Sequence, residues 1–326
     1  MKTVKDEKEW LRRMQKEATA HEERKTAQKS VKERHTPKGV RKSGNGFKSV
    51  AGMEHLKQMV TEAFINVLKN SECADAYGIM PPSLLFYGPA GCGKTFFAER
   101  IADELGINFI KVVPDDLAST LVHGTQEKIG ELFRKAEAKA PTLVFFDEFD
   151  AMVPRRTADD KNYQNGETNE FLCMLNNAAE RGVYVIAATN HPERIDKAIL
   201  RSGRIDEMIY VDMPDLKARE SQFRLALSNL PVEENVDYSR LAELTKGYNC
   251  SDISYIIKLA SRKKFNESIM DVESKSFKPI TQALLEEVIA SKSPSVSSRD
   301  LKEFERVRLE FSPKDEGCKR MAVGFR

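Results

Sequence analysis

The sequence predicts an α/β protein with a five-stranded parallel sheet, followed by a small all-helical domain. Three observations support this fold class: short apolar runs, helical patterns between them, and the loss of strand signals after Pro214. Continuous apolar strands that alternate with helices are typical of a parallel sheet covered on both faces. The five expected strands are residues 83–87, 108–113, 142–146, 183–188 and 207–211.

Helices are expected between these strands. The first runs from Thr95 to about Leu105, the second ends in "EKIGELFRKAEAKA", and the third contains "FLCMLNNAAE". Helical patterns continue from Pro214 to the end of the chain. We therefore divide the chain into a charged arm and linker (1–46), an α/β domain (47–213), a helical lid domain (214–292), and a C-terminal helix and tail (293–326).

Composition favours a globular protein, because 31% of the residues are charged and 40% are hydrophobic. No apolar run approaches the ~18 residues that a membrane span needs, and the N-terminus is too charged for a signal peptide. Five scattered cysteines form no metal-ligand spacing, which predicts a reducing, cytoplasmic location. Residues 1–48 carry 15 Lys/Arg and 7 Asp/Glu, so a basic arm precedes a mildly acidic body.

A glycine-rich loop follows the first strand and opens the first helix. Its spacing, Gly88-x-x-x-x-Gly93-Lys94-Thr95, satisfies the P-loop pattern in the context that the pattern requires. Glycines let backbone N–H groups face phosphate oxygens, Lys94 can reach the β- and γ-phosphates, and the Thr95 hydroxyl can ligate Mg²⁺. The sequence therefore predicts a nucleoside triphosphate on the whole loop, Gly88, Pro89, Ala90, Gly91, Cys92, Gly93, Lys94 and Thr95.

The third strand ends in an acidic pair, Asp147 and Glu148, at the sheet edge where α/β proteins bind their ligands. Some fifty residues after a P-loop, this pair is interpreted as a Walker B motif. Asp147 would coordinate Mg²⁺ through water, and Glu148 would polarise the attacking water. No Asn-Lys-x-Asp element that reads guanine occurs in the chain, which favours ATP over GTP.

The stretch "TNHPERIDKAILRSGRID" resembles the second region of homology of AAA ATPases. The similarity extends from about Phe47 to Phe311 and includes "GFKSVAGMEHLKQMV", "AYGIMPPSLLFYGPAGCGKT" and "GYNCSDISYIIKLA". Every fixed position of the second region is met, by Thr189, Asn190, Asp196, Ala198, Arg201, Arg204 and Asp206.

The resemblance implies roles for residues outside the P-loop. Asn190 would be the sensor that holds the water or the γ-phosphate. Arg201 and Arg204 would be arginine fingers that reach the nucleotide of a neighbouring subunit, which implies a homo-oligomer, expected to be a hexameric ring. The resemblance also implies further nucleotide contacts. Val50 and Ala51 would contribute backbone groups from the entry segment, "GFKSVAGMEHLKQMV". Phe96 directly follows the P-loop, and Cys250 and Ser251 lie in the lid turn within "GYNCSDISYIIKLA".

Two positions depart from the family pattern. Val122 stands where AAA unfoldases carry a pore aromatic, followed by His123 and Gly124, and an aliphatic side chain offers less contact area to a threaded polypeptide. Cys92 stands where many relatives have threonine. We interpret Cys92 as a small tolerated residue; the alternative is a redox-sensitive thiol whose pKa the loop dipoles lower.

These features predict an ATP-hydrolysing AAA protein that couples hydrolysis to the remodelling or unfolding of a protein substrate or complex. The alternative is an AAA+ protein that acts on nucleic acid, with the basic arm as its phosphate contact. The complete second region of homology favours the protein remodeller. A third hypothesis is a nucleotide-gated scaffold that hydrolyses slowly.

Overall fold

The computed structural model describes residues 45–119, 124–155, 162–201, 203–270 and 278–311. Its centre is a five-stranded parallel sheet with the strand order β2-β3-β4-β1-β5. The strands are β1 (Leu84–Tyr87), β2 (Asn108–Val112), β3 (Thr142–Phe146), β4 (Val183–Thr189) and β5 (Glu207–Tyr210). The predicted fold class is confirmed, and each predicted strand agrees with the observed one to within one residue at either end.

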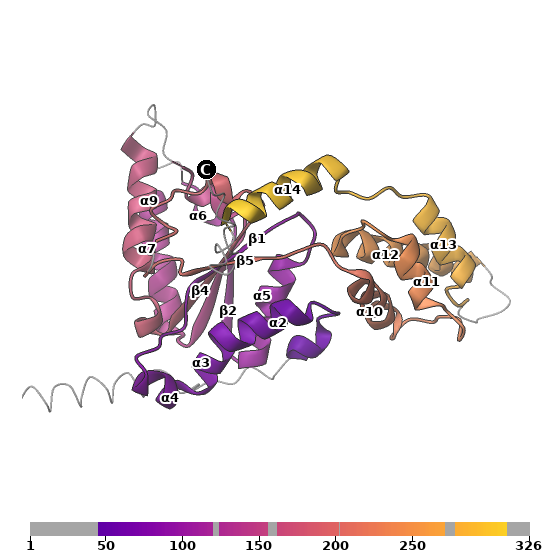
Figure 1. Ribbon diagram of the computed structural model, residues 1–326, viewed down its shortest axis with the longest axis horizontal. Coiled ribbons are helices and arrows are strands. Elements are labelled where there is room, and N and C mark those ends of the chain that lie inside the picture. Colours follow the sequence, from indigo (N-terminus) through magenta and orange to yellow (C-terminus); the bar gives the residue numbers. More distant parts are fainter. Residues whose placement is uncertain (1–44, 120–123, 156–161, 202, 271–277, 312–326) are drawn as a thin grey trace, which may run out of the picture.

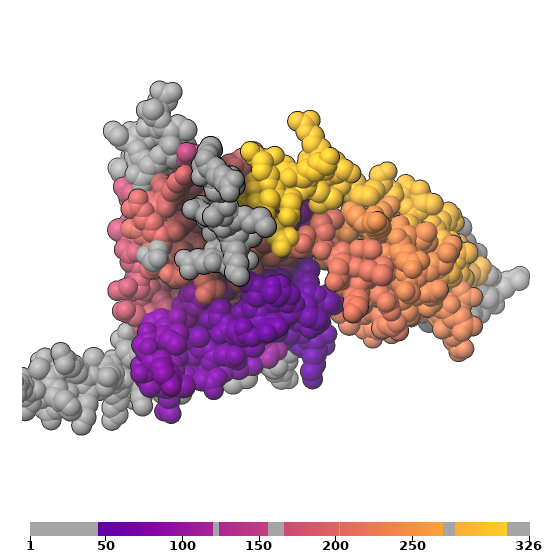
Figure 2. All heavy atoms as spheres, viewed as in Figure 1, coloured from indigo at the N-terminus to yellow at the C-terminus, as the bar shows by residue number. Residues whose placement is uncertain are grey.

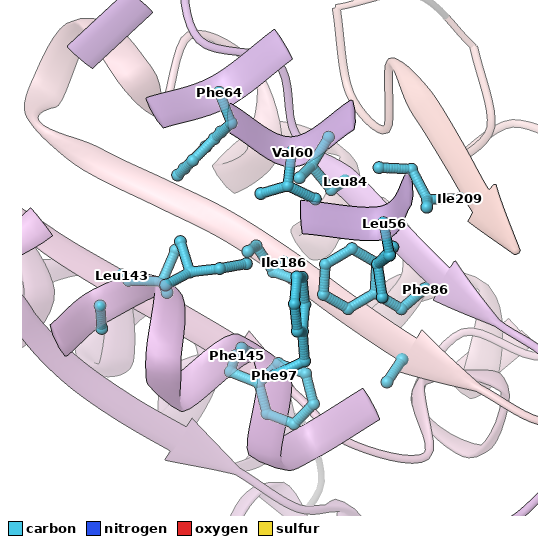
Figure 3. Close-up of a cluster of buried hydrophobic side chains, with 14 of the residues drawn as sticks. Leu56, Val60, Phe64, Leu84, Phe86, Phe97, Leu143, Phe145, Ile186 and Ile209 are labelled. Atoms are coloured by element: carbon cyan, nitrogen blue, oxygen red, sulfur yellow. The ribbon is translucent and has the colours of Figure 1, made fainter. Parts of the chain in front are cut away.

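Helices cover both faces of the sheet, because successive side chains of a strand point to opposite faces. On one face, Leu84 and Phe86 of β1 pack with α2 (Glu54–Val60) and α5 (Lys94–Leu105). Figure 3 shows this cluster, with Phe97 of α5 among the strand side chains.

On the other face, Leu85 packs with α7 (Gly124–Ala138) and α9 (Asn162–Leu175). The two pairs of helices lie on either side of the strands in Figure 1.

Shorter elements connect the layers. They are η1 (Gly46–Ser49), η2 (Thr61–Ile65), α3 (Asn66–Lys69), α4 (Ser71–Ala76), α6 (Pro114–Leu117), α8 (Phe149–Met152), η3 (Ala179–Arg181) and η4 (Pro192–Arg194). The third predicted helix was placed too far along the chain, since α9 ends at Leu175. Asn177 then adopts a left-handed conformation with φ 54°, which asparagine tolerates better than most residues and which ends the helix.

The segment after Pro214 forms α10 (Leu216–Leu227), α11 (Tyr238–Leu244), α12 (Cys250–Met270) and α13 (Gln282–Ala290). These helices enclose a core of their own, which includes Phe223, Leu241, Ile256 and Leu285. Side chains cap three of them: Asp215, Asp237 and Thr281 each accept a hydrogen bond from a backbone N–H of the first turn. The helical segment after Pro214 therefore has a hydrophobic core separate from the two clusters on the sheet faces.

The last described helix, α14 (Ser298–Phe311), lies across the top of the sheet in Figure 1. Val307 is buried, and the ring centroid of Phe311 lies 6.2 Å from that of Tyr87 in β1. Arg308 lies 3.6 Å from Asp212 and over the ring of Tyr210. This helix therefore packs back on the carboxyl edge of β1 and β5. Among the described residues, every helix is too short or too polar to qualify as a membrane span.

Candidate nucleotide-binding site

The P-loop occupies the carboxyl end of β1, and its glycines are required by geometry. Gly88, Gly91 and Gly93 have φ values of 141°, 76° and 89°, which side chains disfavour. A Cβ on Gly88 would lie 2.3 Å from the Val211 carbonyl oxygen. A Cβ on Gly91 would lie 2.5 Å from Nδ2 of Asn249. The loop leads into the N-terminus of α5, where backbone N–H groups and the helix dipole favour an anion.

Lys94, the first residue of α5, is buried with 8% of its surface exposed. Its Nζ donates to the carbonyl oxygens of Gly88 and Pro89, both at 2.8 Å, and to Oδ1 of Asn190 at 2.7 Å. Burial is the main cause that lowers the pKa of Lys94 to about 8. The lysine is thus held by neutral oxygens, and a phosphate would offer it a stronger, charged acceptor.

Thr95 and Asp147 meet beside this lysine, where Thr95 Oγ1 donates to Asp147 Oδ2 at 3.0 Å. Lys111, on β2, also lies 2.9 Å from Asp147 Oδ2. A hydroxyl and a carboxylate are the hard oxygen ligands that Mg²⁺ prefers, so the donor set fits that ion. The described residues contain no cluster of three or more His, Cys, Asp or Glu that could hold a metal ion.

Glu148 follows Asp147 and is exposed. Its backbone is left-handed, with φ 51°, and its N–H donates to Asp147 Oδ1 at 3.2 Å. Non-glycine residues rarely adopt this conformation, and such residues cluster at functional sites. The Glu148 carboxylate makes no hydrogen bond or ion pair with the described part of the chain, so it is available to a water molecule.

The end of β4 is fixed by Thr189, which is 2% exposed. Its Oγ1 donates to Oδ1 of Asp150 at 2.5 Å and accepts the backbone N–H of His191 at 2.8 Å. These bonds join β4 to the segment after β3 and hold Asn190 next to Lys94. The structure therefore brings together the P-loop, the acidic pair and the predicted sensor.

Arg201 and Arg204 lie elsewhere. Arg204 donates to the Ala198 carbonyl oxygen at 2.7 Å and to Asn176 Oδ1 at 3.5 Å. Arg201 is exposed and forms no ion pair with any described residue. Two residues after Arg204, the Asp206 N–H donates to the carbonyl oxygen of Ser83, just before β1. The P-loop is at the other end of that strand, roughly 15 Å away at about 3.3 Å per residue.

A cavity of about 430 Å³ lies next to the P-loop, within the range of small-molecule sites. It is bounded by the entry segment, the P-loop, α10 and the start of α12. In Figure 2 the indigo N-terminal elements and the orange helices meet along a border of the face shown. Among its lining residues are the predicted Val50, Ala51, Gly91, Gly93, Phe96, Cys250 and Ser251.

Sequence reasoning missed part of this lining, namely Gln222, Leu225 and Ala226 of α10. Their spacing places them on one face of a helix, a pattern that the sequence contains. Nothing in that pattern shows which ligand or surface the face meets.

The helical domain also contacts the P-loop directly. Asn249, 3% exposed, donates from Nδ2 to the Ala90 carbonyl oxygen at 3.0 Å. The N–H of Ser251 donates to the Gly91 carbonyl oxygen at 3.0 Å. Asn249 was not among the predicted site residues, because no local pattern in the sequence indicates its partner.

Cys92 is fully buried, and its Sγ lies 3.5 Å from Sδ of Met213. Burial is the main cause that raises the pKa of its thiol to about 12, and the nearby Cys250 adds to the shift. The redox alternative needed a lowered pKa, and it is wrong on this point. Other sequence features, the pore residues Val122 and His123 and the basic arm, lie outside the described residues.

The parallel sheet, the P-loop at its carboxyl edge and the adjoining helical domain define a nucleotide-binding protein of the P-loop class. A family model described as "ATPase family associated with various cellular activities (AAA)" matches residues 84–213. The chain is 36% identical to a cell division cycle protein 48 homolog of Archaeoglobus fulgidus over 275 aligned residues. The aligned region covers 81% of this chain and 38% of the relative. The chain belongs to the AAA ATPase family of the AAA+ superfamily.

A human relative, ATPase family gene 2 protein homolog A, is 35% identical over 227 residues, 68% of this chain and 25% of the relative. The chain therefore spans less than half the length of these relatives. Membership of the family implies nucleotide binding.

Proposed function

We propose that the chain hydrolyses ATP in a ring, expected to be a hexamer, in which each subunit completes the site of its neighbour. The single observation that carries this proposal is the placement of Arg204, which lies toward the end of β1 opposite the P-loop. Arg204 therefore lies away from the P-loop of its own subunit, and we expect it to reach the nucleotide of a neighbouring subunit. An arginine finger is worth ~10³–10⁵ in rate in nucleotide hydrolases, so a second subunit would supply a large part of catalysis.

Each residue of the site has a separate task in this proposal. Lys94 and the P-loop N–H groups bind the phosphates in the ground state. Glu148 holds the attacking water and accepts its proton, while Asn190 orients that water or the γ-phosphate. Thr95 and Asp147 would hold Mg²⁺, which when bound would neutralise charge on the phosphate oxygens.

We further propose that hydrolysis drives the remodelling or unfolding of a protein substrate. The complete second region of homology and the similarity to a cell division cycle protein 48 homolog support this choice. The alternative, action on nucleic acid through the basic arm, predicts salt-sensitive DNA or RNA binding that is lost when residues 1–44 are deleted. Absence of such binding would favour the protein remodeller.

The shared site is tested by specific ATPase activity across a dilution series. We expect activity per subunit to fall as the ring dissociates, because an isolated subunit binds ATP without the arginine finger of a neighbour. Mixing Arg204→Ala subunits with parent subunits should reduce activity more steeply than simple dilution does. The proposal would be overturned by constant specific activity at concentrations where sedimentation shows monomers.

The mode of substrate engagement is tested at Val122. If a polypeptide passes this loop, Val122→Tyr should increase the coupling of hydrolysis to peptide unfolding, because an aromatic side chain offers more contact area than valine. Val122→Asp should abolish it while basal hydrolysis continues. If Val122→Asp retains full remodelling activity, the substrate is engaged at a surface and not at this loop.

A further inference from the structure

Gln222 is a polar side chain in the wall of the cavity beside the P-loop, among apolar neighbours such as Phe96 and Leu225. Its Nε2 donates to the Cys250 carbonyl oxygen at 2.7 Å and to Ser254 Oγ at 3.2 Å. Because a carbonyl oxygen can only accept, the first bond fixes which end of the carboxamide faces α12. The Gln222 Oε1 atom is then left as an acceptor with no hydrogen bond to any described residue.

The three serine hydroxyls that line the cavity each donate their proton to a backbone carbonyl oxygen. Ser49 donates to the Gly46 carbonyl oxygen at 2.7 Å, Ser251 to that of Gly91 at 3.3 Å, and Ser254 to that of Cys250 at 2.9 Å. Both Nε2 protons of Gln222 are also used. The hydroxyl and carboxamide groups of the wall therefore offer acceptors to a ligand and no free proton.

A cavity wall whose side chains offer hydrogen-bond acceptors favours a base that donates a hydrogen bond. It disfavours a base that presents a carbonyl oxygen at the same place. Adenine carries an amino group at position 6, where hypoxanthine and guanine carry an oxygen. We infer that Gln222 is a specificity-determining residue whose Oε1 accepts a hydrogen bond from the 6-amino group of adenine. The inference rests on the proposed function, since it assumes that this cavity holds the base of a nucleotide bound at the P-loop.

The test is equilibrium binding of ATP and ITP to the full chain, with Glu148→Gln as the background so that neither nucleotide is consumed. ITP replaces the 6-amino group of ATP by an oxygen. The parent should bind ATP about tenfold or more tightly than ITP, because a 6-oxo group would leave Oε1 unpaired. Gln222→Met keeps the length of the side chain without the acceptor, and it should reduce this preference by about tenfold through weaker ATP binding.

The substitution should leave the wall folded, since the Cys250 carbonyl oxygen keeps the Ser254 hydroxyl as its donor. Gln222→Leu serves as a second apolar variant, and thermal unfolding checks both. The matched control is Gln58→Met, which removes a glutamine of α2 that donates to Glu62 and does not line the cavity. Gln58→Met should retain the parent's ATP-to-ITP ratio.

Three outcomes would overturn the inference while the proposed function stands. Equal loss of ATP and ITP binding would show that Gln222 only packs against the base. An unchanged ratio would assign discrimination to the backbone of the entry segment. If Gln222→Met changes the preference for ATP over 2′-deoxy-ATP but not the preference for ATP over ITP, Gln222 contacts the ribose and not the base. If the parent binds neither nucleotide, or if Lys94→Ala binds ATP as tightly as the parent, the proposed function itself fails.

Discussion

Lys94 Nζ donates a hydrogen bond of 2.7 Å to Oδ1 of Asn190. The two residues are 96 positions apart in the chain, and the contact joins the P-loop to the end of β4. The amide oxygen and the two P-loop carbonyls surround a buried cation with neutral acceptors. Binding of a phosphate would exchange these acceptors for a charged one and would release the Asn190 side chain to contact the nucleotide.

The first prediction is that ATP affinity decreases as pH rises above about 8. The pKa of Lys94 in the free protein is about 8, and the negative phosphates of bound ATP would raise it. Affinity is then full below pH 8 and falls above it by up to about tenfold per pH unit, until the pKa of the complex is reached. Fluorescent-nucleotide titrations from pH 7 to 9.5 measure the slope. Lys94→Ala should abolish detectable binding, and residual binding with the parent's slope would contradict the assignment.

Glu148→Gln should keep nucleotide binding and lose turnover. The exposed Glu148 carboxylate bonds to no described residue, so its removal leaves the phosphate contacts of Lys94 unchanged. Loss of a general base costs about 10²–10⁴ in rate. Binding by titration calorimetry and phosphate release by a coupled assay separate the two effects. An unchanged rate would show that another group activates the water.

Gly91→Ala should weaken nucleotide binding by moving the helical domain away from the P-loop. The added Cβ would lie 2.5 Å from Nδ2 of Asn249, which bonds to the loop. Gly78→Ala is the matched control: its φ of 66° is similar to the 76° of Gly91, and nothing lies within 4 Å of its Cβ. Both variants should lose about 1 kcal/mol of stability from backbone strain. Affinity for ATP should fall, by about tenfold, in Gly91→Ala alone; an equal affinity in both would rule out the contact.

Asp252 should contribute stability that disappears in acid. It is 2% exposed, accepts the N–H groups of Asn249 and Ser295, and lies 3.0 Å from Lys292 Nζ. Burial acts to raise the pKa of Asp252, but hydrogen bonds from Ser295, Lys292 and Asn249 outweigh it, and the net pKa lies below its usual value.

A lowered folded-state pKa gives a contribution that is complete above the unfolded pKa of about 4 and is lost as pH falls through the folded value. Asp252→Asn should therefore lower the free energy of unfolding by about 3 kcal/mol at pH 7. Urea unfolding at pH 7 and at pH 3 should show the difference from the parent shrinking in acid. A difference that does not depend on pH would assign the effect to packing.

Cys92 should resist alkylation in the folded protein at pH 7.5. Its thiol is buried with a pKa of about 12, so almost no thiolate forms. Cys73 and Cys173 are exposed and should react first. Peptide mass spectrometry after timed iodoacetamide treatment gives the order. Labelling of Cys92 at the rate of Cys73 would restore the redox interpretation.

The sequence by itself determined the strands, the P-loop and the acidic pair. Each depends on neighbours in the chain: an apolar run fills a buried strand, and Gly88 and Gly93 permit a loop conformation that side chains disfavour. The chemistry of Lys94 and Thr95 follows from the same short segment. These features are encoded within a few residues, so local patterns are enough to predict them.

Tertiary structure decided which distant groups meet. β1 lies between β4 and β5, and this order brings Asn190 to Lys94 while it leaves Arg204 toward the opposite edge of the sheet. The packing of the helical domain places Asn249 on Ala90, 159 residues away, and Gln222 in the wall of the cavity. Such contacts depend on how whole elements pack to bury their apolar faces, and burial is non-directional, so no residue pattern along the chain specifies the partner.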